Sequence, residues 1–234
     1  MPESRVRSPH GLLTGGYMGN RYTDEFFSLT CCGDVLNVVS PISGSKPTKE
    51  ISEAMGARRV IKDMALKRCK GGELKDGYDL LDLCAGNALT SVLSVFTLPI
   101  REAVAIDKRE VKRRWHLAKR FTYLNVDIKG KIRCKHPTII VGVHACKDLA
   151  ERVIEIYLEN ELAEHLVLMP CCVGSENFSG QYRTRYRDLQ LTRYEHWCWH
   201  LAKMCDGEFK KDPFVMSPAN IIITASKPGC RYVL

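Results

Sequence analysis

The sequence predicts an α/β fold, in which a mostly parallel sheet carries helices on both faces. Two short apolar runs, at residues 78–83 and 103–106, are separated by an apolar stretch of helical length at 88–97. Parallel strands need a long crossover connection, usually a helix, so this spacing favours a right-handed βαβ unit. Further β-rich runs at 121–128, 138–146, 165–169 and 221–224 continue the pattern. Helical segments are predicted at 147–160 and in the later part of 178–204, as an alternating fold requires.

The length of 234 residues favours one domain with a short extension over two domains. Residues 1–46 are predicted as an N-terminal extension that is partly irregular, and residues 47–234 as the main domain. Within the main domain, apolar residues of segment 47–69 recur at three- and four-residue steps between Lys and Arg. This pattern indicates an amphipathic helix that precedes the first strand.

The composition indicates in which compartment the protein works and which kind of partner it binds. No apolar run is long enough to span a membrane and no charged-then-apolar leader is present, which predicts a soluble, cytoplasmic protein. The eleven cysteines are odd in number and several lie in strand-like runs. They are therefore predicted to be small buried side chains in a reducing compartment, without a disulfide framework. The net charge of +8 favours an anionic partner such as RNA. Oligomeric state is left open.

A basic segment follows the second strand of the predicted βαβ unit. Residues 108–120 contain seven Lys and Arg. The sequence predicts a helix here, whose outer face is either simply solvated or contacts RNA. Arg113 and Arg114 in this segment, and Arg183 and Arg185 near the C-terminus, are the predicted RNA contacts.

The turn after the first strand indicates which cofactor the fold would bind. A dinucleotide site needs several glycines for the pyrophosphate, whereas residues 84–87 contain one, Gly86. Asp82, just before the turn, would repel a pyrophosphate but attract an ammonium and a sulfonium. Asp107 ends the second strand, where a carboxylate can accept hydrogen bonds from both ribose hydroxyls. These features together predict S-adenosylmethionine as the cofactor.

Two further motifs carry a resemblance to a known family. The stretch at 78–109 resembles motif I and the following acidic position of class I methyltransferases. The sequences GVHACKDLA at 142–150 and VLMPCCVG at 167–174 are similar to a branch of that class. The branch includes the eukaryotic tRNA acceptor-stem 2′-O-methyltransferase. Two positions depart from its pattern, because Lys147 replaces a usual glycine and Val173 stands where a histidine or other polar residue often occurs.

The resemblance implies a Rossmann-like class I methyltransferase fold, with a seven-stranded mostly parallel sheet. It implies an S-adenosylmethionine-dependent methyltransferase that acts on RNA, with the adenine amine held beside Asp127 after the third strand. A protein or small-molecule methyltransferase is the alternative, as is a non-catalytic partner protein that binds the cofactor. The residues predicted to bind the cofactor are Asp82, Cys84, Ala85, Gly86, Asn87, Asp107, Lys108, Asp127 and His144.

The candidate catalytic residues are His144, Cys146 and Cys171. Histidine titrates near neutral pH, so His144 could take a proton from a substrate hydroxyl. A cysteine could instead attack a pyrimidine ring as a nucleophile. Zinc bound by these three residues and Cys172 is a third hypothesis, although adjacent cysteines lack the usual ligand spacing, so no metal is predicted. In a fourth interpretation, the residues only pack and shape the pocket.

Overall fold

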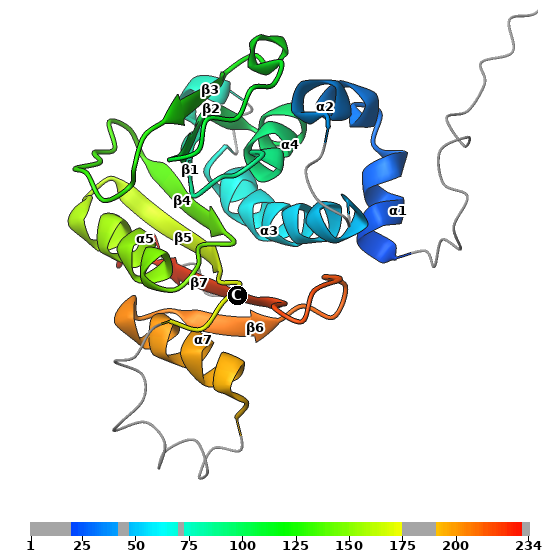
Figure 1. Ribbon diagram of the computed structural model, residues 1–234. Coiled ribbons are helices and arrows are strands. Elements are labelled where there is room, and N and C mark those ends of the chain that lie inside the picture. The colour runs from blue at the N-terminus through cyan, green and yellow to red at the C-terminus, as the bar shows by residue number, and fades with distance from the viewer. Residues whose placement is uncertain (1–19, 42–46, 70–72, 175–190, 231–234) are drawn as a thin grey trace, which may run out of the picture.

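The computed structural model describes residues 20–41, 47–69, 73–174 and 191–230, and in them a seven-stranded sheet forms the centre of the molecule (Figure 1). The strand order is β3-β2-β1-β4-β5-β7-β6. β7 runs antiparallel to its neighbours β5 and β6, and the other pairs are parallel. The predicted fold class is therefore confirmed. The strands are β1 (Tyr78–Leu83), β2 (Ile100–Asp107), β3 (Phe121–Asn125), β4 (Thr138–Val143), β5 (Ala163–Met169), β6 (Glu208–Lys211) and β7 (Ile221–Ser226).

Helices cover both faces of the sheet, as Figure 1 shows. The described helices are α1 (Arg21–Ser28), α2 (Cys32–Val39), α3 (Pro47–Arg68), α4 (Leu89–Thr97), α5 (Asp148–Glu159) and α7 (Arg193–Met204), with 3-10 turns η1 (Leu74–Asp76) and η2 (Trp115–Leu117). Successive strand residues point to opposite faces, so Ile139 joins the core under α1 to α4 while Ile140 joins the core under α5 and α7. None of the described helices is long and apolar enough to cross a membrane.

The described part of the N-terminal extension packs into the main core. α1 and α2 bury Phe26, Val35 and Val39 completely, against residues of α3 and α4. The hydroxyl of Tyr22 donates a hydrogen bond to Asp212, in the turn between β6 and β7, over 2.5 Å. These contacts join residues from both ends of the described chain, so the two helices are an integral part of the domain's packing.

The prediction of a helix at residues 108–120 is wrong. This segment is irregular apart from the short turn η2. Its like charges recur at three- and four-residue separations, which destabilises a helix. Other partners take its side chains instead: Arg113 donates to the Val39 carbonyl at the end of α2 over 3.0 Å. Trp115 stacks on Tyr123 of β3, with ring centroids 4.8 Å apart. The segment is thus attached to α2 and β3 rather than to itself.

The start of α5 holds Lys147 in a backbone conformation that favours glycine, with φ 52° and ψ −126°. A side chain here is strained, by about 1–3 kcal/mol at such positions. Replacing the lysine by glycine would relieve this strain. Part of the gain in stability is offset, because glycine makes the unfolded chain more flexible. Lys147→Gly is therefore expected to stabilise the fold by about 1 kcal/mol, raising Tm by roughly 2–4 °C. Differential scanning calorimetry measures the shift.

The matched control is Lys112→Gly, in the irregular segment 108–120, because the backbone φ of Lys112 is not positive. That change should leave Tm unchanged or lower it, because it relieves no backbone strain, raises the entropy of the unfolded chain and removes only an exposed ion pair with Glu110. A Lys147→Gly variant that melts below the wild type would show that the lysine side chain contributes more than its backbone strain costs.

Candidate active site

A cavity of about 510 Å³ lies at the carboxyl ends of the parallel strands. The carboxyl ends of β1, β2, β3 and β4 lie at one edge of the sheet (Figure 1). Residues of α3 and of the start of α5 complete the cavity walls. All nine residues predicted to bind the cofactor line this cavity, and so does Cys146, whereas Cys171 does not. The lining residues are Glu50, Ala54, Asp82, Cys84, Ala85, Gly86, Asn87, Leu89, Thr90, Asp107, Lys108, Arg109, Asp127, Ile128, Val143, His144, Cys146 and Leu149.

The turn between β1 and α4 is wound tightly over the cavity floor. Cys84, Gly86 and Ala88 all have left-handed backbones, with φ of 61°, 56° and 54°. Only the glycine adopts that region without strain, so two side-chain-bearing residues are held there by their surroundings. Asn87 contributes to this support, because its side-chain oxygen accepts a hydrogen bond from the Leu89 N–H over 3.1 Å. Strain of this kind is concentrated at functional sites.

The carboxylate of Asp107 is buried and fully engaged. It accepts hydrogen bonds from the Gly86 N–H and the Arg109 N–H, both over 2.9 Å. The Arg109 side chain adds two more, over 3.0 and 3.1 Å. Burial alone would raise the pKa of this carboxyl, but the hydrogen bonds from Arg109 and Gly86 outweigh it and hold the pKa below the usual value. Asp107 is therefore an anion that ties the β1–α4 turn to β2.

Asp82 is the second buried acid of the cavity and has fewer partners. It is 1% exposed, and the hydroxyl of Ser91 in α4 donates to one of its oxygens. The other oxygen, Oδ1, has no hydrogen-bond partner within the part of the chain that the structure describes. Burial, followed by the nearby charge of Asp107, raises the pKa of the Asp82 carboxyl to about 7. An unpartnered, buried carboxylate oxygen on a cavity wall is suited to a cationic ligand group.

Asp127 and Lys108 lie at the outer rim of the cavity. Asp127 stands two residues beyond the end of β3, and its side chain accepts a hydrogen bond from the Lys129 N–H over 2.9 Å. Both residues are exposed. They reach the cavity from neighbouring strand ends, as predicted, but neither is held as firmly as the two buried acids.

His144 follows β4 and faces a buried acid that the sequence analysis did not identify. Its Nε2 atom lies 2.7 Å from Oε2 of Glu53, whose side chain is completely buried in α3. With Glu53 as a carboxylate, which can only accept, Nε2 would carry the ring proton and Nδ1 would be the acceptor nitrogen. The backbone of His144 is left-handed, with φ 68°, and its N–H donates to the Met169 carbonyl over 2.9 Å. β4, β5 and α3 thus fix the imidazole together.

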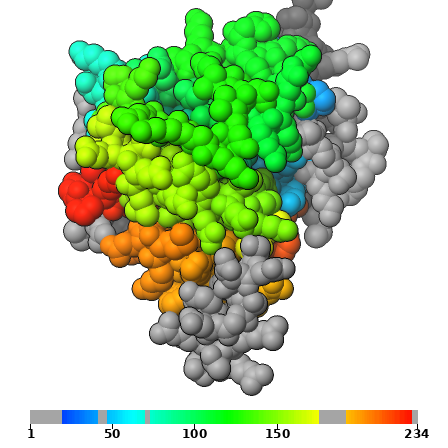
Figure 2. Space-filling view, turned by 60° about the vertical axis from the view of Figure 1, so that its left-hand side comes forward, coloured from blue at the N-terminus to red at the C-terminus, as the bar shows by residue number. Residues whose placement is uncertain are grey.

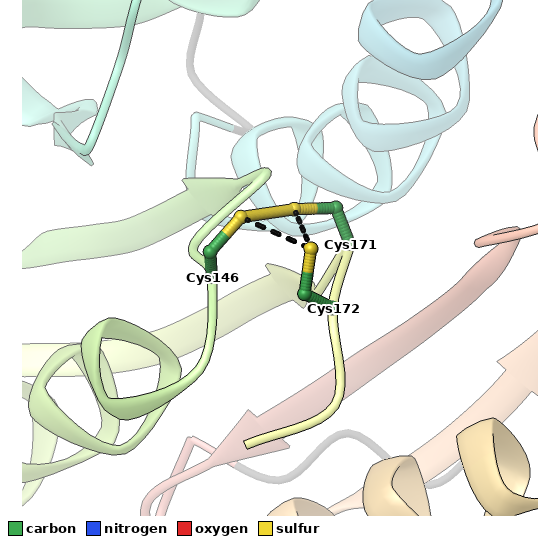
Figure 3. A group of neighbouring side chains, drawn as sticks. All are labelled: Cys146, Cys171 and Cys172. Carbon is green, nitrogen blue, oxygen red and sulfur yellow. Dashed lines mark hydrogen bonds between the residues drawn. A yellow bond between two sulfur atoms is a disulfide. The ribbon is translucent and has the colours of Figure 1, made fainter. Parts of the chain in front are cut away.

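The cysteines after β4 and β5 form one cluster (Figure 3). Cys146 and Cys171 are joined by a disulfide, which corrects the prediction that the cysteines form none. The prediction failed because residues 142 and 143 of β4 lie beside 168 and 169 of β5, so the two loops leave the sheet side by side. Cys172 lies with its sulfur 3.5 Å from both partners. A cysteine nucleophile at Cys146 or Cys171 would require this bond to be reduced.

Three residues beyond the predicted set contribute chemistry: Glu50 and Arg109, which line the cavity, and the buried Glu53 behind His144. Glu50 accepts a hydrogen bond from the Asn87 side chain, and burial raises its pKa above the usual value. Glu53 follows Glu50 by three positions on one helix, a spacing that places them on one face. The amphipathic pattern of 47–69 could have suggested this, because two acids share the helix face that was expected to pack on the sheet.

Comparisons with known proteins agree with this architecture. Residues 59–175, half of the chain, match the model of a protein family described as "Methyltransferase domain". No curated protein sequence matches the chain. The apo structure of the S-adenosylmethionine-dependent methyltransferase SibL is 12% identical, with a TM-score of 0.44, covering 73% of this chain and 55% of SibL. The chain thus spans about half the length of that protein.

Two further solved structures are similar at the same level. Magnesium protoporphyrin IX methyltransferase (ChlM) from Synechocystis PCC 6803, with bound SAH, is 10% identical, with a TM-score of 0.47, covering 88% of this chain and 98% of ChlM. The 23S rRNA methyltransferase ErmE is 15% identical, with a TM-score of 0.40, covering 73% of this chain and 68% of ErmE.

The chain belongs to the methyltransferase domain family, and it is a class I methyltransferase that depends on S-adenosylmethionine. The residues of the cavity fit this cofactor. The unpartnered oxygen of Asp82 suits its ammonium, and the turn at Gly86 lets the backbone approach closely. The buried carboxylate of Asp107 stands where a ribose can be bound, at the end of β2.

Proposed function

We propose that this methyltransferase acts on RNA and methylates a ribose 2′-hydroxyl. The observation that carries this proposal is His144, which lines the cavity and is paired with the buried Glu53. A hydroxyl is a poor nucleophile until a base takes its proton, and a neutral imidazole held in one tautomer is suited to that task. The similarity of the motifs at 142–150 and 167–174 to the 2′-O-methyltransferase branch supports the same acceptor.

In this mechanism the bound cofactor supplies a methyl group on a positively charged sulfur. Asp82 and Asp107 hold its ammonium and its ribose, while Asp127 accepts from its adenine amine. Nδ1 of His144 accepts the proton of the substrate hydroxyl. Glu53, which keeps the proton of the ring on Nε2, then stabilises the imidazolium that forms. The side chains of α3 cover the site and help to exclude water.

The RNA contacts that we propose from the structure differ from those that the sequence predicts. Arg113 and Arg114 both donate hydrogen bonds to α2 residues, so they are less available to a ligand than their sequence suggests. Arg183 and Arg185 lie outside the described residues. A different run of cations is free to contact RNA. It is the loop between β3 and β4, here called the basic loop, which exposes Lys129, Lys131, Arg133 and Lys135.

The basic loop is held in place by α5 and by the residue that follows it. Arg152 of α5 donates to the Ile128 and Gly130 carbonyls over 3.1 and 3.2 Å. Asn160 accepts from the Cys134 N–H over 2.8 Å. In the described part of the chain, no acid lies within salt-bridge distance of the four basic-loop cations. In Figure 2 the green residues that include this region lie directly above the yellow-green α5. The loop therefore offers a fixed strip of positive charge that begins at the cavity rim.

The test for RNA begins with the reaction product. RNA and DNA are incubated with the protein and isotopically labelled S-adenosylmethionine, digested to nucleosides, and analysed by mass spectrometry. We expect the label in 2′-O-methylated ribonucleosides and none in DNA. Label in a base, or only in added protein or small-molecule acceptors, would contradict the proposal. A cytoplasmic location, with access to RNA under reducing conditions, is part of the same proposal.

A second measurement tests the basic loop. Replacing Lys129 and Lys131 by glutamine should weaken RNA binding and reduce the slope of log K against log salt by about 0.7 per lost phosphate contact. Affinity for S-adenosylmethionine should not change. Lys210→Gln, on the exposed edge strand β6, is the matched control and should leave RNA binding intact. Equal salt slopes for both variants would show that RNA does not contact this loop.

The raised pKa of Asp82 makes a prediction about pH. Below about 7 the carboxyl holds a proton that must leave before it can pair with an ammonium. Cofactor affinity should therefore rise by up to about tenfold per pH unit as pH approaches 7, because one proton is released on binding. The gain should level off above about pH 7, where Asp82 is ionised, and affinity should fall again above roughly pH 7.7–8.0, where the cofactor's own α-amino group loses its charge. Isothermal titration calorimetry in buffers of different ionisation enthalpy measures both effects.

Asp82→Asn should bind the cofactor more weakly, with no change in affinity between pH 5.5 and 7. Its amide keeps the shape of the side chain and can still pair with Ser91. A wild-type protein whose affinity is equally flat over this range would show that Asp82 does not meet the ammonium in ionised form.

A further inference from the structure

The three sulfurs of Cys146, Cys171 and Cys172 gather at the tips of β4 and β5. Figure 3 shows the Cys172 side chain pointing at the pair formed by the other two. All three sulfurs lie within 4.8 Å of one another. Cys172 is exposed and the other two are partly exposed, so the group can be reached from solvent. The cluster stands beside the cavity, since Cys146 forms part of its wall.

A disulfide alone does not account for this arrangement. It uses two thiols, whereas the third sulfur also lies 3.5 Å from each of them. Three thiolates that bind one tetrahedral zinc, at about 2.3 Å each, stand about 3.8 Å apart. Both separations that involve Cys172 are close to that spacing. Once the Cys146–Cys171 bond is reduced, the three sulfurs surround a single point.

From these observations we infer that the reduced protein binds one zinc ion through Cys146, Cys171 and Cys172. Thiolates are soft ligands that select zinc over magnesium or calcium. The fourth position is left for water or a substrate group, since no further His, Cys, Asp or Glu of the described residues belongs to the cluster. His144 is not that ligand, because neither of its ring nitrogens belongs to the cluster.

The ion would connect the loops that follow β4 and β5, two residues after His144. The loop after β4 contains left-handed residues at His144 and Lys147, which a bond from Cys146 to the metal would help to hold. The inference does not depend on RNA being the substrate, because it concerns only the three thiols. Zinc binding by thiols releases protons and stabilises the folded state.

The experiment uses the full chain, purified without a metal-binding tag, reduced, and freed of metal. Zinc or cobalt is added and the bound metal is counted by mass spectrometry. We expect one metal per chain, and for cobalt a thiolate charge-transfer band together with the visible bands of a tetrahedral site. Zinc should also protect Cys146, Cys171 and Cys172 from alkylation while the partly exposed Cys69 still reacts.

Cys172→Ser should lose stoichiometric binding and the charge-transfer band. Its side chain is exposed, so the fold should survive. Circular dichroism is the check on this. Cys172→His should retain one metal with a weaker charge-transfer band, because one thiolate is replaced by an imidazole. Cys69→Ser is the matched control and should behave as wild type. A reduced protein that binds no metal, or a Cys172→Ser variant that binds it as tightly as wild type, would overturn the inference.

Discussion

Replacing His144 by alanine is expected to lower turnover by roughly 10²–10⁴ at saturating substrate, with cofactor affinity nearly unchanged. The reason is that the variant lacks the proton acceptor for the substrate hydroxyl. The change also leaves the buried carboxylate of Glu53 without its hydrogen-bond partner, its other oxygen being 3.5 Å from the Lys49 ammonium. Stability must therefore be measured alongside, because loss of a partner from a buried charge destabilises folding.

His144→Gln separates catalysis from packing. The glutamine amide nitrogen can take the position of Nε2 and donate to Glu53, but the amide cannot accept the proton of a hydroxyl, so stability should return while turnover stays low. Glu53→Gln is the complementary change. Its amide can donate to Nε2, which would shift the ring proton to Nδ1 and remove the acceptor, so we expect a loss of about 10²-fold or more.

The pH profile distinguishes these roles further. Wild-type turnover should fall toward acid pH, as the imidazole takes up a proton and can no longer act as a base. The residual activity of the glutamine variant should lack this acid limb. A glutamine variant with full turnover, or identical pH profiles for the two proteins, would show that His144 is only structural.

Much of the site could be predicted from the sequence because a parallel sheet fixes where strands end. Residues such as Asp82, Asp107 and His144 were identified by their position after apolar runs, and all of them line the cavity. That inference needs only the strand positions, since the topology brings the carboxyl ends together. The turn residues 84–87 followed from the same argument.

The partners of these residues could not be predicted. Glu53 is more than ninety positions before His144, and nothing in a helical pattern reveals which acid is buried against which tip. Likewise, the pairing of Cys146 with Cys171 depends on the register of β4 against β5. Such contacts are long-range, and the sequence specifies them only through the complete fold.

Weak local signals caused the other errors. The edge strand β6 was missing from the predicted strands. It pairs on one side only, and its sequence, EFKK, lacks the apolar alternation of a buried strand. The segment 108–120 was expected to be helical from its apolar members and charges, but Trp115 and Arg113 have stronger partners outside it. In both segments, tertiary contacts outweigh the local preference of the chain.

Asp107→Ala is expected to weaken cofactor binding by about 1.5–3 kcal/mol, the range for hydrogen bonds to a charged group. That corresponds to roughly 10–150-fold in Kd. The ribose hydroxyls would lose their acceptor, and the Gly86 N–H would lose its partner. In the wild type, the exposed side chain of Arg109 donates hydrogen bonds to both carboxylate oxygens of Asp107, so it competes with the ribose. Arg109→Ala should therefore bind the cofactor at least as tightly as wild type.

Ligand fragments identify which contact each variant has lost. S-adenosylhomocysteine and 5′-methylthioadenosine share the ribose and adenine, but only the first has the ammonium. Asp107→Ala should weaken both ligands by the same factor, because both lose the ribose contact, whereas Asp82→Asn should weaken S-adenosylhomocysteine alone. Calorimetric titration of both ligands into each variant gives the four values. If Asp107→Ala binds 5′-methylthioadenosine as well as wild type does, the ribose is not held at the end of β2, and the carboxylate serves only to tie Gly86 and Arg109 together.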